Sequence, residues 1–234
     1  MHDKEIQFAN IEVPEDILSR WQDIADILAN VLGVPAALIM RVVHADIEVF
    51  VSSKTTGNPY TAGSRERLLG SGLYCETVIS AKSKLLVPNA LADERWKDNP
   101  DVKLNMISYL GFPIRMPDGT VFGTICVLDS KENAYAPAFE QLIEQFRYIV
   151  EAHLELLHMN TVLGDKNRKL QDYIDEIRVL RGVLPVCAIC KKIRDENGKW
   201  HQIERYITDR SEARFSHAFC PDCAAKWREE QGLA

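Results

Sequence analysis

The feature that most constrains this chain is a run of Leu and Ile at strict seven-residue spacing in its C-terminal half. The positions are Leu142, Ile149, Leu156, Leu163, Leu170, Ile177 and Leu184. A helix docked on a globular domain drifts off a strict seven-residue repeat, whereas two supercoiled helices stay in register with it. The repeat therefore predicts a coiled-coil helix over 142–184. The alternative is one long helix docked on its own domain.

The second seam of the repeat, three residues after the first, is mixed in character. It consists of Gln145, Ala152, Met159, Lys166, Tyr173 and Leu180. A Lys in such a seam fixes the register of two helices at some cost in stability, and Gly164 weakens the helix by about 1 kcal/mol. We expect a parallel homodimer, because that arrangement sets two identical N-terminal domains side by side and brings both C-terminal ends together.

Charge and hydropathy limit the partners of the chain. Its 234 residues carry a net charge of −6, with −8 on residues 1–157 and +1 on residues 185–234. A body this acidic repels nucleic acid, so we do not expect nucleic-acid binding. No apolar run approaches the roughly 20 residues that cross a bilayer, and the N-terminus shows no signal-peptide pattern. We expect a cytoplasmic protein without membrane contact, in which cysteines stay reduced.

The first segment has the pattern of a mixed α/β domain. Apolar residues recur at helical spacing between Pro14 and Gly33, which are typical of the two ends of a helix. Strand-like runs follow at 36–43, 47–53, 84–88, 106–116 and 120–129. The last two flank a hairpin-type connection at 117–119. The order predicts an α+β fold, an antiparallel sheet with flanking helices.

The stretch "LYCETVISAKSKLLVPNALADERWKDNPDVKLNMISYLGFPIRMPDGTVFGTICVLD" closely resembles a GAF domain, the small-molecule sensory module of bacterial signalling proteins. The similarity covers roughly residues 14–157, and its most specific parts are "VPNALADERW" and "GTICVLD". The resemblance implies a sensory domain over 1–157, with a pocket roofed by the excursion between strands. It does not identify the small-molecule ligand, because one fold hosts many binding functions.

Three residues are candidates for lining that pocket: Arg95, Trp96 and Tyr109. The alternative is that Trp96 and Tyr109 fill the core and that Arg95 pairs with a nearby carboxylate such as Asp93. The surrounding segment 94–103 mixes charges of both signs, so we expect it to lie in solvent.

The cysteines of this segment argue against the specialised members of the family. Cys75 is followed by Glu and Cys126 by Val, whereas bilin-binding members usually have His after the attachment cysteine. Members that reduce free methionine sulfoxide use a cluster of cysteines, and this segment has two. The signature of cyclic-nucleotide binders is missing as well. We expect both thiols to be packed and inert.

Two cysteine pairs lie near the C-terminus, Cys187 with Cys190 and Cys220 with Cys223. A segment of about fifty residues with few large apolar side chains does not easily hold a fold alone, and four thiolates complete the tetrahedral set that Zn²⁺ prefers. We expect structural Zn²⁺ on these four residues, with iron as the main alternative. His217 is expected to support the site from outside the ligand set.

The 29 residues between the two cysteine pairs predict a series of short structural elements. Asn197-Gly198 predicts a hairpin, residues 203–207 an amphipathic turn of helix, and Pro221 the first turn of a last helix. This order resembles a treble-clef zinc finger, so we assign a zinc-binding module to 185–234. The segment also resembles one that follows GAF, PAS and receiver modules in bacterial signalling proteins.

These patterns predict a non-enzymatic signal-transduction protein. A GAF domain senses a small ligand or partner, a dimeric coiled coil transmits, and a zinc module acts on an unknown downstream signalling protein. The alternative is a GAF-regulated zinc-finger protein that binds nucleic acid. An enzyme is a third hypothesis, for which no nucleophile–base pattern was found.

Overall fold

The computed structural model describes residues 12–178 and 184–232. The chain divides into two compact units, the first ending at Gly164 and the second beginning at Asp165. The division falls inside the long helix α3 (Pro137–Arg178), so this helix contributes residues to both units. The boundaries expected at 157 and 185 stay predictions, and each unit is described by itself.

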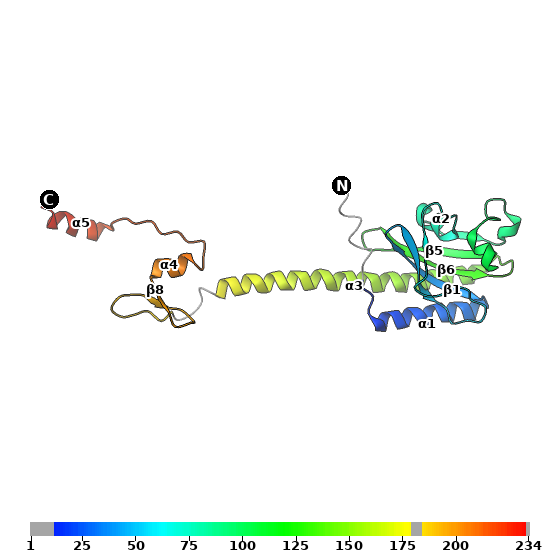
Figure 1. The fold of residues 1–234 in the computed structure, drawn as a ribbon, viewed down its shortest axis with the longest axis horizontal. Coiled ribbons are helices and arrows are strands. Elements are labelled where there is room, and N and C mark those ends of the chain that lie inside the picture. The colour runs from blue at the N-terminus through cyan, green and yellow to red at the C-terminus, as the bar shows by residue number, and fades with distance from the viewer. Residues whose placement is uncertain (1–11, 179–183, 233–234) are drawn as a thin grey trace. The chain divides into compact units, whose positions relative to one another are not determined.

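The first unit is built on an antiparallel sheet of six strands in the order β3-β2-β1-β6-β5-β4 (Figure 1). The strands are β1 (Ala36–Val43), β2 (Asp46–Ser52), β3 (Arg65–Arg67), β4 (Leu85–Val87), β5 (Ser108–Arg115) and β6 (Val121–Asp129). The expected hairpin joins β5 to β6, with Leu110 opposite Val127 in its register. The predicted α+β fold with an antiparallel sheet is confirmed.

Helix α1 (Glu15–Leu32) confirms the helix predicted from the apolar spacing. Pro14 immediately precedes it with an extended backbone, and Gly33 ends it in the left-handed region, at a φ of 65°. Both residues act as expected, because proline suits the start of a helix and glycine its end. The fully buried Trp21 is the largest side chain that α1 packs against the sheet.

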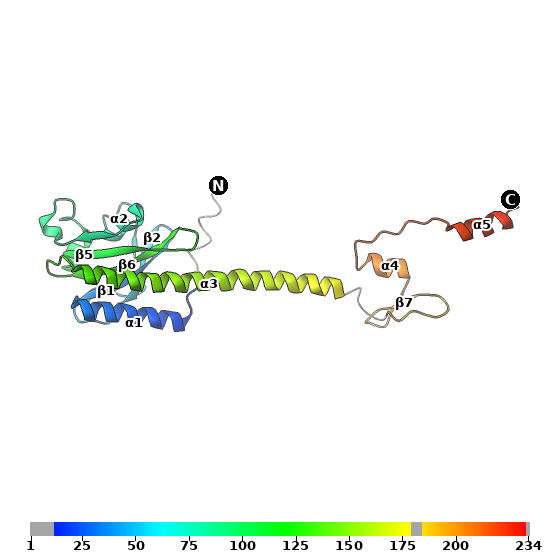
Figure 2. The same ribbon diagram turned by 180° about the vertical axis from the view of Figure 1, so that it is seen from behind.

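Helices α1 and α3 lie side by side on one face of the sheet (Figures 1 and 2). Their apolar side chains form one buried layer with alternate residues of the strands. From α3 the layer contains Ile143, Val150 and Leu154. On β6 it takes Ile125 and Val127, since successive side chains of a strand point to opposite faces.

The excursion between β2 and β5 supplies the two edge strands, β3 and β4, and covers the other face of the sheet. It also contains helix α2 (Tyr74–Ala81) and two short 3-10 helices, η1 (Ala90–Ala92) and η2 (Pro100–Leu104). Strand β3 was not expected, because its three charged and exposed residues carry no apolar alternation. It forms by pairing with the edge of β2, where Ile47 lies opposite Glu66.

Helix α3 confirms the long helix as far as Arg178. Residues 179–183 lie outside the described part of the chain, and Leu184 lies in a segment without helical structure. The last fully buried side chain that the structure describes on α3 is Leu154, and Leu157 and His158 after it are half-buried. Docking on the first unit therefore explains the start of the helix and not its whole length.

The second unit holds small elements in the order expected from the sequence. A hairpin of β7 (Ile193–Arg194) and β8 (Trp200–His201) precedes α4 (Ile203–Thr208) and α5 (Pro221–Glu230). The connection between the two strands covers residues 195–199 and is wider than a two-residue Asn-Gly turn. The side chain of Asp195 accepts hydrogen bonds from within this connection. Its Oδ1 accepts hydrogen bonds from the backbone N–H groups of Asn197 and Lys199, at 3.0 and 2.8 Å. Its Oδ2 contacts His201 Nε2 at 2.7 Å.

Candidate functional site

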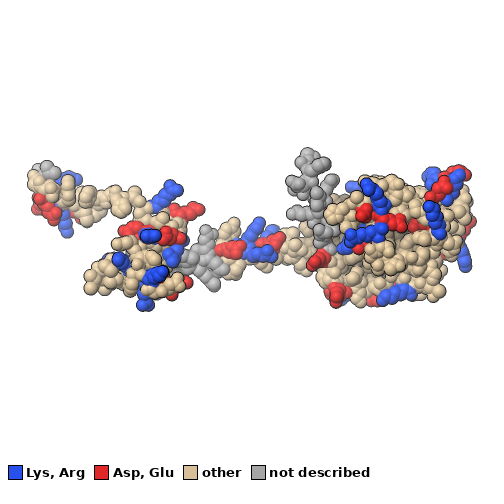
Figure 3. All heavy atoms as spheres, viewed as in Figure 1, with Lys and Arg blue, Asp and Glu red and all other residues tan. Residues whose placement is uncertain are grey.

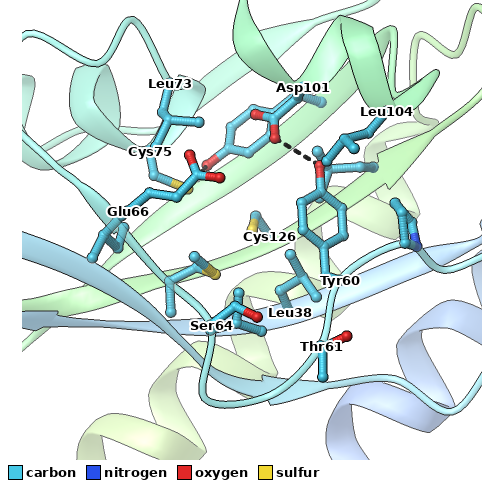
Figure 4. A pocket seen from close by; sticks show the side chains of 16 residues that line it. Leu38, Tyr60, Thr61, Ser64, Glu66, Leu73, Cys75, Asp101, Leu104 and Cys126 are labelled. Carbon is cyan, nitrogen blue, oxygen red and sulfur yellow. Dashed lines mark hydrogen bonds between the residues drawn. The ribbon is translucent and has the colours of Figure 1, made fainter.

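A cavity of about 260 Å³ lies in the first unit between the sheet and the excursion (Figure 4). Its floor comes from β1, β2, β5 and β6, one wall from α2, and its roof from η2 and the loop before β3. The lining residues are Leu38, Met40, Ile47, Val49, Pro59, Tyr60, Thr61, Ser64, Glu66, Leu73, Cys75, Asp101, Leu104, Tyr109, Cys126 and Leu128. Aliphatic side chains dominate this surface, as they do in small-molecule sites.

Local hydrogen bonds fix the wall and the roof to each other. Asn99 precedes η2 and accepts a hydrogen bond from the backbone N–H of Asp101 at 2.9 Å. Its Nδ2 donates to the carbonyl oxygen of Gly72 at 2.6 Å, in the turn before α2. Glu76 of α2 accepts from the N–H groups of Gly70 and Gly72, and these bonds lower the pKa of its carboxyl. The roof is thus held in place without a ligand.

The polar centre of the cavity is a pair formed by Asp101 and Tyr60. The hydroxyl of Tyr60 donates to Asp101 Oδ1 at 2.7 Å, across the space that Figure 4 shows. Burial raises the pKa of the Asp101 carboxyl from 3.8 to about 6, against the opposing effect of the Tyr60 hydrogen bond. Burial also raises the pKa of Tyr60, so its phenol stays protonated and donates.

The charge of the cavity is negative. Glu66 is exposed and lines the cavity at its rim, and its charge further raises the pKa of Asp101. Among the described residues that line the cavity, none is Lys, Arg or His. An anionic ligand would therefore meet two carboxyl groups without a compensating cation.

An aromatic cluster lies beside the cavity and α2, and of its three rings only that of Tyr109 lines the cavity. The rings of Tyr74 and Tyr109 stack at a centroid distance of 4.8 Å, and the ring of Trp96 lies tilted against Tyr74 at 5.3 Å. The Tyr109 side chain lies along β5 over Gly111, where a Cβ would come within 2.1 Å of its hydroxyl oxygen. Gly111 is thus the residue that lets the Tyr109 ring lie flat.

Two thiols face the same space. Cys75, in the first turn of α2, and Cys126, in the middle of β6, both line the cavity and are both buried. The hydroxyl of Thr124 donates to Cys75 Sγ at 3.3 Å, and Tyr109 Oη lies 3.5 Å from the same sulfur. The two cysteines were expected to be packed, and they are, but they also meet at a cavity wall.

The three residues proposed from sequence for the pocket separate in the structure. Tyr109 is fully buried and lines the cavity. Trp96 packs against the buried layer from outside, and it does not line the cavity. Arg95 also lies outside the cavity, and its exposed guanidinium pairs with Asp93 at 2.8 Å.

Sequence reasoning missed Asp101 and Tyr60. The segment 94–103 was expected in solvent, and this expectation is wrong for Asn99 and Asp101, which are both buried. The available signal was local: an Asn followed by Pro is a typical helix start. That turn of helix brings Asp101 under the roof, whereas the charge pattern alone indicated only an exposed loop.

The second unit holds the four cysteines predicted to bind zinc. In each pair a backbone N–H of the second cysteine hydrogen bonds to the first sulfur, and Cys223 N lies 3.4 Å from Cys220 Sγ. These bonds lower the pKa values of Cys187 and Cys220. Thiolates held this way suit a metal ligand set.

The two pairs are not assembled into one site. Within the described ranges, no group of three or more His, Cys, Asp or Glu side chains is placed to hold a metal ion. The second pair begins α5, and His217 lies exposed in the segment before it. The donor chemistry of each pair fits zinc, whereas the ligand set and the role of His217 stay predictions.

A sheet with helices on one face and a mainly apolar, roofed cavity on the other is the architecture of a small-molecule-binding α+β module. Residues 16–154 match the model of the GAF domain family, which is more than half of the chain. The chain therefore belongs to the GAF domain family.

Known proteins with a similar fold or sequence are distant. One solved structure is of a methyl-accepting chemotaxis protein (residues 122 to 287), with a TM-score of 0.52, 16% identity, and coverage of 66% of this chain and 95% of that one. Another is free methionine-R-sulfoxide reductase from Neisseria meningitidis, with a TM-score of 0.50, 12% identity, and coverage of 61% and 80%. These similarities show the fold alone.

Among curated proteins, the diguanylate cyclase DgcP of Escherichia coli (strain K12) is 26% identical over 87 residues. The match covers 36% of this chain and 26% of that protein, so this chain spans about a quarter of the relative's length. Among the described helices, none is both long and apolar enough to span a bilayer.

Proposed function

We propose that this chain is a signalling protein whose cavity binds a small molecule and whose helix α3 carries the effect out of the domain. The observation that supports this function is the double role of strand β6. It lines the cavity with Cys126 and Leu128, and it packs against the α1–α3 layer with Ile125 and Val127. A ligand in the cavity thus lies one strand away from α3.

The lining indicates the chemical class of the ligand. Aliphatic walls favour an apolar body, and the carboxyls of Asp101 and Glu66 favour a positively charged group or a hydrogen-bond donor. A cation beside Asp101 offsets the cost of burying its carboxylate. We therefore propose a small apolar ammonium compound in preference to a nucleotide or a carboxylate.

Three probes with one ring and different charges test this proposal: benzylammonium, benzyl alcohol and benzoate. Binding to the full chain at pH 7.5 is measured by calorimetry. Benzylammonium is expected to bind at least about tenfold more tightly than benzoate, which corresponds to about 1.4 kcal/mol. The preference should narrow at pH 5, where the Asp101 carboxyl, with a pKa of about 6, is mostly protonated.

Asp101→Asn is the matching variant, because it keeps the oxygen that accepts from Tyr60 and removes the charge. It should narrow the preference for benzylammonium over benzoate, and the carboxylate of Glu66 accounts for the preference that remains. Equal binding of benzoate and benzylammonium by the unaltered protein would contradict the ligand class. Failure of all three probes on a folded protein would contradict the cavity as a binding site.

We propose further that α3 pairs with a second copy of this chain as a parallel homodimer. Its large exposed apolar side chains, among the residues described, are Tyr148, Ile149, Leu156, Met159, Val162, Leu163, Leu170, Tyr173 and Ile174. Every one occupies a seam position of the seven-residue repeat or the position directly beside it. Leu156, Leu163 and Leu170 are each more than half exposed on one chain, at 53, 55 and 57%. A second helix with the same repeat covers such a stripe.

Light-scattering chromatography tests the dimer. Leu163→Asp with Leu170→Asp should give monomers at tens of micromolar, because each buried Leu contributes roughly 1.5–3 kcal/mol. Thr161→Asp with Arg168→Gln makes the same change in net charge at positions away from the seams and should leave the dimer intact. A monomeric unaltered protein would contradict the proposal.

The second unit is proposed as a zinc-dependent output module that contacts a downstream signalling protein. The support is the four-cysteine set and the paired N–H···S turns. The alternative, a nucleic-acid binder, is less favoured, because Lys and Arg lie interspersed with Asp and Glu on the face drawn in Figure 3. Binding of random DNA at two salt concentrations separates the two functions.

The absence of enzymatic activity is also a proposal. The family is typically regulatory, but the sulfoxide reductase and the diguanylate cyclase among the similar proteins carry enzymatic names. Neither similarity extends those activities to this chain. Assays of both activities with the purified chain test the proposal, and turnover in either would contradict it.

A further inference from the structure

The two thiols of the cavity come from different elements and share one environment. Cys75 lies on α2 and Cys126 on β6, yet both sulfur atoms face the space between Leu73 and Leu38 in Figure 4. Nothing in the proposed ligand chemistry uses them. Both are buried in the folded chain and both line the cavity, so a reagent meets them only inside the cavity.

The surroundings of the two sulfur atoms are unequal. Cys75 is next to three groups that carry a hydrogen: the Cys126 thiol, the Thr124 hydroxyl at 3.3 Å and the Tyr109 hydroxyl at 3.5 Å. Hydrogen bonding to these groups, led by Cys126, lowers the pKa of Cys75 despite its burial. The neighbouring Cys75 and burial raise the pKa of Cys126 well above its usual value. The two shifts run in opposite directions, so Cys75 gives up its proton more readily than Cys126 does.

We propose that Cys75 is a peroxide-reactive cysteine and that Cys126 is its resolving partner, so that the cavity wall forms a reversible disulfide. The oxidant is hydrogen peroxide or a small hydroperoxide, which fits the cavity. This inference is independent of the proposed ligand, since it needs no amine and no second chain.

The reaction balances in two steps. The Cys75 thiolate attacks one peroxide oxygen, so that an S–O bond forms and the O–O bond breaks. The leaving hydroxide takes a proton from solvent and becomes water. The Cys126 thiol then attacks the sulfenic sulfur, so that the S–S bond forms, the S–O bond breaks, and its proton leaves with the hydroxyl as water. Two thiols lose two electrons, the peroxide gains them, and a dithiol such as dithiothreitol reverses the result.

The bond would join α2 to the sheet at the wall of the cavity. In the reduced form these elements meet through packing and the hydrogen bonds around Cys75. In the oxidised form a covalent bridge would hold α2 against β6, on the strand that also contacts the α1–α3 layer. Oxidation would therefore act at the same wall as a ligand.

Peptide mapping of the unaltered full chain tests the proposal. The reduced protein is treated with stoichiometric hydrogen peroxide, alkylated with N-ethylmaleimide and digested with trypsin without reductant. The expected product joins peptide 68–82 to peptide 116–131, with a mass two hydrogens below their sum. Dithiothreitol should return both peptides. Recovery of both as alkylated thiols, or linkage of Cys75 to another cysteine, would overturn the proposal.

Two variants assign the roles of the thiols. Cys126→Ser should retain a sulfenic acid on Cys75 that dimedone traps, because the resolving thiol is gone. Cys75→Ser should leave Cys126 unreactive toward both peroxide and dimedone. Dimedone labelling of Cys126 in that variant would reverse the assignment and refute the proposal as stated. The exposed Cys190, Cys220 and Cys223 and the half-buried Cys187 serve as internal references for general thiol oxidation.

Discussion

Replacing Asp101 by Asn is expected to stabilise the first unit at neutral pH. The carboxyl is buried, and its pKa lies at about 6 instead of 3.8, mainly because of burial. The folded state therefore holds the proton more tightly than the unfolded state, so ionisation destabilises the fold. At 1.36 kcal/mol per pKa unit, the ionised carboxyl costs about 3 kcal/mol at pH 7.5. Asn keeps an oxygen for the Tyr60 hydroxyl and cannot ionise.

The sign of the pH dependence is part of this prediction. The free-energy cost of the ionised Asp101 carboxyl is small at pH values below the pKa of this group in the unfolded chain. The cost grows as the pH rises from about 4 to 6 and is constant at higher pH. Urea unfolding from pH 4 to pH 8, followed by fluorescence of the buried Trp21, measures it. The free energy of unfolding of Asp101→Asn should be higher than that of the unaltered protein by about 2–3 kcal/mol at pH 7.5. At pH 4 the difference should be less than about 1 kcal/mol.

A matched control lies in the same loop. Asp98 is exposed, so Asp98→Asn should leave the free energy of unfolding nearly unchanged at every pH. The reasoning is refuted if Asp101→Asn destabilises the protein at pH 7.5. It is refuted equally if the difference between the two proteins does not grow with pH, because the burial of the carboxylate would then carry no cost.

Three further outcomes are expected. The purified chain should carry about one zinc ion, and the double variant Cys187→Ser with Cys223→Ser should lose it. Full zinc occupancy of that variant by mass spectrometry would contradict the assignment of the four cysteines as ligands. Gly111→Ala should push the Tyr109 ring into the cavity, cost about 1–3 kcal/mol in urea unfolding and abolish binding of the benzylammonium probe. Gly164→Ala should raise helicity by circular dichroism and stabilise α3 by about 1 kcal/mol, since a Cβ there meets nothing within 4 Å; unchanged helicity would contradict this.

The sequence predicted the elements whose own residues decide their structure. Pro14, Gly33 and the apolar spacing between them predict helix α1. Long apolar runs on both sides of a turn predict β5 and β6. Strand β3 escaped prediction because its three charged residues have no pattern, and the edge of β2 imposes the strand. Local signals thus found the parts of the fold that do not depend on distant partners.

The cavity was harder to predict, because its polar residues come from segments far apart in the chain. Tyr60 and Asp101 meet only when the excursion folds over the sheet, and neither lies in a motif that marks a site. Tyr109 was predicted because an aromatic residue in a strand suggests a pocket or a core, and here it belongs to both. Burial of a charged residue is a property of the assembled roof, so composition alone assigned Asp101 to solvent.

The two-sided packing of β6 limits how this protein can diverge. Inserting or deleting one residue in β6 would exchange its faces, placing Cys126 among the helices and Val127 in the cavity. The same change in the loop over 53–64 moves no strand residue to another face. Relatives of this chain should therefore differ in β6 by substitution at constant length, and tune their ligands through loops of variable length.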